Sequence, residues 1–93
     1  MQKFLFLHYG FEAPTAAIMS AWKAWFDGLG DSLLEQGHLP SGIEVTAQGA
    51  TALPLAADSI TGYCIITTAN LEAAQQIAGR CPQIVATRVY PIK

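Results

Sequence analysis

The chain has little charge and no long apolar run. Only 13% of its 93 residues are charged, and five Lys plus Arg against seven Asp plus Glu give a formal net charge of −2. No basic cluster is present that could neutralise several phosphates at once. The N-terminal apolar stretch stops at His8, too soon for a membrane-spanning helix or the core of a secretion signal. We therefore expect no nucleic-acid partner and no membrane partner.

Cysteine is equally scarce. Cys64 and Cys81 are the only two, and neither belongs to a CxxC motif or to a Cys/His cluster with zinc-ligand spacing. The two histidines, His8 and His38, are thirty residues apart and have no carboxylate at partner spacing, and no glycine-rich phosphate loop is present. These absences predict buried thiols in a cytoplasmic protein, with no metal and no cofactor.

What the chain does have is apolar residues, at 52%, which suits a single compact domain over residues 1–93. Residues 2–9 read as a strand, because they are rich in aromatic and branched side chains and end at Gly10. Side chains alternate along a strand, and both of its sides are apolar. One side carries Phe4, Phe6 and His8, and the other carries Leu5, Leu7 and Tyr9.

The rest of the chain alternates between helical and strand patterns. A stripe of apolar residues at three- and four-residue steps, from Ile18 to Leu33, predicts a long helix that begins at Pro14 and ends near Gly37. Asn70 is a good N-cap for a second helix. The predicted segments are strands at 43–46, 61–67 and 87–92, a long hairpin connection at 47–59, and the second helix at 71–78.

The order β-α-β-β-α-β predicts an α+β, ferredoxin-like fold, with an antiparallel four-stranded sheet and both helices on one of its faces. Two helices cover only one face, yet the first and third strands are apolar on both sides. A second copy of the sheet, packed roughly 10 Å away, would cover the other face and make a homodimer. The alternative is that residues 47–59 fold over the open face as a lid.

The order and spacing of several motifs resemble the YCII-related, or DGPF-type, domain. The motifs lie at residues 3–10 (KFLFLHYG), 21–30 (AWKAWFDGLG), 62–66 (GYCII), 70–74 (NLEAA) and 79–82 (GRCP), so the resemblance covers nearly the whole chain. It implies a dimeric α+β barrel, a small bacterial protein of unassigned activity, and a cleft between sheet and helices or at the dimer edge.

Some proteins of that wider group carry a His–Asp dyad, with His on the first helix and Asp directly before a Pro ahead of the last strand. This sequence departs from the pattern at both places. Its first helix has no His, the corresponding position lying near Trp22, and Cys81 precedes Pro82. The acid–base chemistry of the dyad is therefore not carried over to this chain.

The candidate site residues are one histidine and several aromatic residues. His8 at the end of the first strand is a candidate catalytic base, with an interfacial, partly buried histidine as the alternative. The candidate ligand-binding residues are Tyr9, Trp22, Trp25 and Tyr63, because an apolar aromatic wall with a few polar groups is typical of small-molecule sites. The two tryptophans could instead fill the space between helix and sheet.

The leading hypothesis is a small homodimeric protein that binds a small molecule in the cleft. One alternative is a cofactor-independent enzyme, a lyase, isomerase or monooxygenase-like protein that transfers a proton with His8 as base. Another is a structural or regulatory module that docks on a partner through the sheet. Fold alone does not decide between these, because such barrels host unrelated activities. The sequence does not identify the ligand.

Overall fold

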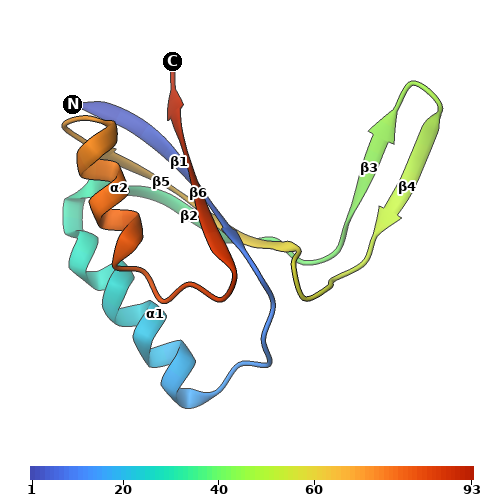
Figure 1. Cartoon of the computed structure of the whole chain (residues 1–93), viewed down its shortest axis with the longest axis horizontal. Helices are drawn as coiled ribbons and strands as arrows, with labels where there is room; N and C mark the ends of the chain where they lie inside the picture. The colour runs from blue at the N-terminus through green and yellow to red at the C-terminus, as the bar shows by residue number, and fades with distance from the viewer.

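The computed structural model describes all 93 residues, which form two layers and a projecting hairpin (Figure 1). A short 3-10 turn, η1 (Gly30–Ser32), follows the first helix. The helices are α1 (Ala16–Leu29) and α2 (Leu71–Gly79), and the strands are β1 (Gln2–Tyr9), β2 (Leu33–His38), β3 (Gly42–Thr46), β4 (Gly49–Leu53), β5 (Ile60–Thr68) and β6 (Ala86–Ile92).

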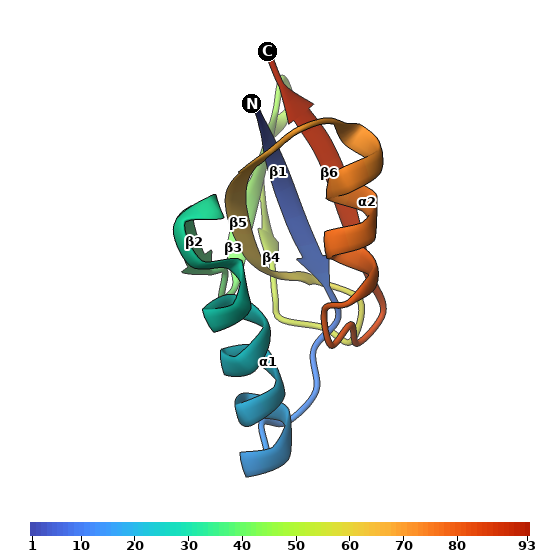
Figure 2. The same ribbon diagram turned by 90° about the vertical axis from the view of Figure 1, so that its left-hand side faces the viewer.

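The main sheet has four antiparallel strands in the order β2-β5-β1-β6. Figure 2 shows both helices in front of one face of this sheet. An α+β chain with two helices and an antiparallel sheet is consistent with the expected ferredoxin-like plan.

The core lies between the helices and the sheet. Phe4 and Phe6 of β1 are fully buried, together with Cys64 and Ile66 of β5, which lie opposite them in the register. Ala74 and Ala78 of α2 complete this core cluster, whereas α1 contributes only partly buried residues. The alternation expected for the first strand is confirmed, because Phe4, Phe6 and His8 are buried while Leu5, Leu7 and Tyr9 are not.

The prediction of one helix from Pro14 to Gly37 was wrong at its C-terminal end. The helix stops at Leu29, since Gly30 adopts φ +56° and its N–H bonds the Asp27 carbonyl. The chain then turns and enters β2, which pairs with β5. At the other end, Thr15 is the N-cap and its hydroxyl accepts a hydrogen bond from the Ile18 N–H at 3.2 Å.

The second strand of the sheet is therefore β2 rather than the predicted strand at 43–46. That segment forms β3, which pairs with β4 in a separate hairpin. We call residues 42–53 the arm. The arm stands away from the sheet (Figure 1), and every one of its residues is exposed. The segment at 47–59 thus does not lie on the sheet as the lid considered above.

In the C-terminal half, the structure agrees closely with the elements predicted from the sequence. Asn70 caps α2 as predicted, its side-chain oxygen accepting from the Ala73 N–H at 2.9 Å. The last strand begins one residue earlier than expected, at Ala86. Pro91 sits near the end of β6, on the edge of the sheet, where a missing N–H costs no ladder hydrogen bond.

Candidate functional site

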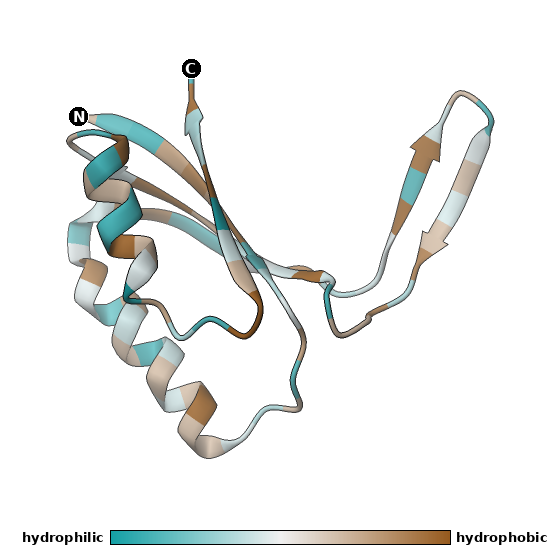
Figure 3. Ribbon diagram, viewed as in Figure 1, coloured by the Kyte–Doolittle hydropathy of each residue, from teal (hydrophilic) through white to brown (hydrophobic).

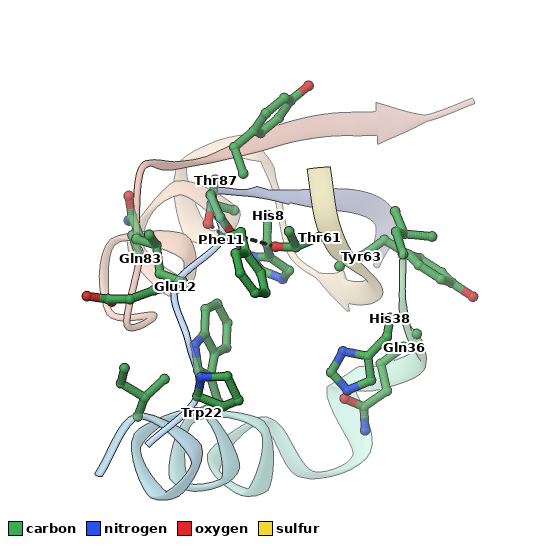
Figure 4. Close-up of a pocket in the computed structure, with 18 of the residues that line it drawn as sticks. His8, Phe11, Glu12, Trp22, Gln36, His38, Thr61, Tyr63, Gln83 and Thr87 are labelled. Carbon is green, nitrogen blue, oxygen red and sulfur yellow. Dashed lines mark hydrogen bonds between the residues drawn. The ribbon is translucent and has the colours of Figure 1, made fainter. Parts of the chain in front are cut away.

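A cavity of about 710 Å³ lies between α1 and the end of the sheet. Figure 4 shows His8, Thr61 and Thr87 on its sheet side and Trp22 on its helix side. Gln36 and His38 of β2 lie at one end of it, and Glu12 and Gln83 lie at the other. The remaining lining side chains are largely apolar and include Phe11, Ile18, Met19, Phe26, Leu39, Leu55 and Ile84.

The cavity is present because only the second half of α1 packs on the core. Trp25, Phe26 and Leu29, in its second half, contact the buried core cluster. Ile18 and Trp22, in its first half, line the cavity instead. No residue of α1 is fully buried, which leaves this helix the more weakly anchored of the two.

His8 occupies the sheet side of this cavity and is only 6% exposed. Its Nδ1 lies 3.0 Å from the Thr87 hydroxyl and its Nε2 lies 3.7 Å from the Cys64 thiol. The rings of Trp22 and Trp25 stand edge-on to the imidazole, with centroids 5.0 and 5.7 Å away. Burial lowers the pKa of His8 to about 4, so the ring is neutral at pH 7.

That environment limits what His8 can do chemically. Both ring nitrogens already face protein groups, and an imidazole with a pKa near 4 is a weak base at neutral pH. No carboxylate is hydrogen-bonded to the ring, so nothing in the chain would stabilise an imidazolium formed during a reaction. The geometry favours a fixed neutral ring in the wall of the cavity.

The two thiols are linked to His8 through hydrogen bonds. Cys64 contacts the imidazole directly, and Thr87 connects Cys81 to it, since the Thr87 hydroxyl lies 3.2 Å from the Cys81 sulfur and 3.0 Å from the imidazole. Burial raises the pKa of Cys64 to about 12, and burial also raises the pKa of Cys81. Both thiols are therefore protonated at neutral pH, which argues against either as a nucleophile.

Of the aromatic residues expected to bind a ligand, Trp22 lines the cavity and Trp25 does not. The Trp25 indole lies between the layers, with its N–H donating to the Ile77 carbonyl at 3.2 Å and its ring 6.2 Å from that of Phe6. It is thus part of the packing between helix and sheet, which was the alternative interpretation for both tryptophans.

Tyr9 and Tyr63 adjoin the cavity, but the register places their side chains on the opposite face of the sheet. The Arg88 guanidinium lies 4.6 Å from the centre of the Tyr9 ring. The Tyr63 hydroxyl donates to Glu35, which raises the pKa of Tyr63. Figure 4 shows the Tyr63 ring pointing away from Trp22 and His8.

Sequence reasoning missed several lining residues. The sequence pattern does not point to Gln36 and His38, because it predicts helix and loop for their segment and not the strand whose two-residue alternation brings both to one face. Phe11 lies directly after the Gly10 turn, and an aromatic residue at such a strand end is a signal that could have identified it.

The open face of the sheet, opposite the helices, is apolar at its centre and has no element of the chain packed on it. Leu5, Leu7 and Ile65 occupy its central strands, and Tyr90 and Ile92 of β6 are 46% and 41% exposed. Figures 1 and 2 place the arm on this side of the sheet.

The arm is amphipathic. Ile43 pairs with Ala52 and Val45 with Ala50, so these four side chains share one side of the hairpin. Glu44 pairs with Thr51 on the other side. Figure 3 shows the brown–teal–brown alternation along β3. Ile43 and Val45 are 67% and 72% exposed, so nothing in the chain covers the apolar side.

No group of three or more His, Cys, Asp or Glu side chains in the chain converges as it would to hold a metal ion. Neither helix combines the length and apolar character needed to cross a bilayer.

Comparison with known proteins finds similarity among solved structures. No family model matches the chain, and no curated protein matches it. Among solved structures, that of GlnK from B. subtilis aligns over 100% of this chain and 87% of its own, with 14% identity and a TM-score of 0.48.

Proposed function

We propose that this chain is a small-molecule-binding protein that acts as a homodimer, similar to the YCII-related (DGPF-type) proteins, with its ligand in the cavity between α1 and the sheet. The observation that carries the proposal is that cavity. Its volume of about 710 Å³ lies within the range of roughly 300–1,000 Å³ that is common for ligand sites. Its lining combines apolar walls with a few polar groups, which is their usual composition.

Binding is favoured over catalysis by the state of the chemical groups. His8 is neutral with both nitrogens engaged, and the Cys64 and Cys81 thiols are protonated at neutral pH. An enzyme that used His8 as base would need it to gain a free nitrogen and a higher pKa. Unpaired thiols also support the proposal that the protein works in the cytoplasm.

The homodimer is supported by the open face. This sheet face carries Leu5, Leu7 and Ile65 beside a half-exposed Tyr90, and keeping such an apolar surface in contact with water costs free energy. A second copy of the chain, related by a two-fold axis, covers this face with the same face of its own sheet. An interface of roughly 800 Å² per partner is typical of stable complexes.

The arm supports the same assembly. An isolated two-stranded hairpin is at best marginally stable in water, so the apolar side of the arm needs a surface to pack on. Because the arm stands on the open-face side of the sheet, a second copy stacked there lies within its reach (Figure 1). In the proposed dimer, Ile43 and Val45 pack against the partner.

Screening for ligands by thermal shift tests the binding function. Metabolites that stabilise the wild-type protein should stabilise a Lys23→Ala control equally, because Lys23 is on the solvent side of α1 in an exposed ion pair with Asp27. They should stabilise Trp22→Ala much less, since that change removes one wall of the cavity. The proposal fails if several hundred metabolites include no stabiliser, or if every stabiliser acts equally on Trp22→Ala.

A further inference from the structure

The charges around the cavity select among possible ligands. Glu12 is the only Asp, Glu, Lys or Arg side chain in its lining. The five basic residues of the chain, Lys3, Lys23, Arg80, Arg88 and Lys93, all lie outside it. An anion bound there would have no Lys or Arg side chain beside it, which is unfavourable wherever the anion loses its water.

The N-terminus of α1 does not compensate for the missing cation. Thr15 caps that end, its hydroxyl taking the Ile18 N–H at 3.2 Å and its carbonyl taking the Met19 N–H at 3.0 Å. The two residues of α1 before Ile18, Ala16 and Ala17, are absent from the cavity lining. No free helix amide is therefore available to hold a carboxylate or a phosphate.

The walls of the cavity are suited to a flat molecule. Trp22 and Phe26 are separated by 5.9 Å between ring centroids with planes only 30° apart, and Phe11 lines the same space. Such rings favour stacked or edge-on aromatic partners. Glu12 is the one carboxylate in the lining, at the Gln83 end of the cavity (Figure 4), and a carboxylate attracts a cationic group.

Hydrogen-bonding groups at the two ends complete the site. Gln36 lies at one end and Gln83 at the other (Figure 4). The Gln83 amide nitrogen donates to the Ala78 carbonyl at 2.9 Å, which leaves its side-chain oxygen as an acceptor. An acceptor at this end of the cavity suits a ligand that donates an N–H group.

We infer that the ligand of this cavity is an uncharged or cationic planar aromatic molecule that carries N–H donors, and not an anion. This inference rests on the proposed binding function and specifies its ligand class.

Three probes of nearly equal size and different charge test the inference: indole-3-acetamide, tryptamine and indole-3-acetate. Each is titrated into the ¹⁵N-labelled wild-type chain while the amide signals of Gly10 and Gly62 and the indole signal of Trp22 are followed. We expect the neutral and cationic probes to shift these signals and the acetate to bind at least tenfold more weakly. Equal or tighter binding of the acetate overturns the ligand class but leaves the cavity as a binding site.

Variants separate the contributions of charge and shape. Glu12→Gln should weaken tryptamine about threefold or more and leave indole-3-acetamide unchanged, since only the cation interacts with the carboxylate. Lys23→Ala should bind all three probes as the wild type does. If none of the probes binds, the inference is wrong. The thermal-shift screen then decides separately whether the binding function also falls.

Discussion

At the scale of single residues, His8 is placed where its charged form is unfavourable. It is enclosed by Trp22 and Trp25 and bonded to Thr87, and its pKa falls from 6.5 to about 4. The unfolded chain takes up this proton near pH 6.5, whereas the folded chain does so only near pH 4. Between these values the unfolded state binds more protons, so the free energy of unfolding must decrease as the pH falls.

This difference predicts a pH-dependent stability that belongs to His8. Between pH 7.5 and pH 5 the wild-type protein should lose about 2 kcal/mol more stability than His8→Gln does, at about 1.36 kcal/mol per pH unit below 6.5. Urea unfolding of both proteins at the two pH values measures the difference, and the variant cancels the contribution of the carboxyl groups. Parallel losses in the two proteins would show that His8 titrates normally in the folded state.

The alternation of residues along β1 could be predicted from sequence, but the state of His8 could not. The two-residue repeat of a strand places His8 on the same face as Phe4 and Phe6, and all three side chains are buried. Its partners Thr87 and Cys64 are 79 and 56 residues away, so only the register of β5 and β6 brings them to the ring. The position of Trp25 in the core has the same cause, since the Ile77 carbonyl that it bonds belongs to the other helix.

At the scale of elements, the error in the first helix shows how tertiary pairing can overrule a local pattern. The apolar periodicity continues through Leu29 and Leu33, so the sequence pattern has no obvious break there. The helix nevertheless ends, because Gly30 adopts a positive φ and the following segment finds a partner in β5. Of the two glycines near the end of the helix, Gly30 marks this turn and Gly28 stays helical.

Two glycine substitutions distinguish an element end from an element interior. Gly10, just after β1, has φ +114°, and a Cβ there would lie 2.8 Å from the Ile84 side chain. Gly10→Ala should therefore destabilise the fold by about 2 kcal/mol or more. Gly28→Ala should stabilise it by roughly 0.5–1 kcal/mol, since the site is helical with open space around it.

Urea unfolding of the two variants beside the wild type measures both effects. Opposite signs are the expected result. A neutral Gly10→Ala would mean that the Gly10 turn and the chain at Ile84 do not meet as described, and the sheet end of the cavity would then have a different shape.

At the scale of the whole molecule, the sheet has two faces with different environments. The helices and the cavity occupy one, and the other is apolar and open. Apolarity on both sides of β1 and β5 is visible in the sequence, which is why an assembly was expected. The sequence does not predict that the arm projects. Sequence patterns reveal how an element packs within its own chain, and this hairpin packs on nothing there.

The proposed homodimer predicts a charge-sensitive association. Sedimentation velocity over a dilution series should give a dimer for the wild type at micromolar concentration, and a monomer for Tyr90→Glu, which places a charge on the open face. Gln76→Glu adds the same charge on the exposed side of α2 and should leave the dimer intact. A wild-type protein that sediments only as a monomer, or a Tyr90→Glu protein that remains dimeric, would contradict this interface.

The central claim is that the cavity under α1 holds the ligand. An isotope-filtered NOE spectrum tests it most directly, with a labelled chain and an unlabelled compound taken from the thermal-shift screen. The account predicts NOEs from the compound to Ile18, Trp22 and Phe26, which line the cavity. NOEs confined to Leu5, Ile65 and Tyr90 on the open face would contradict it.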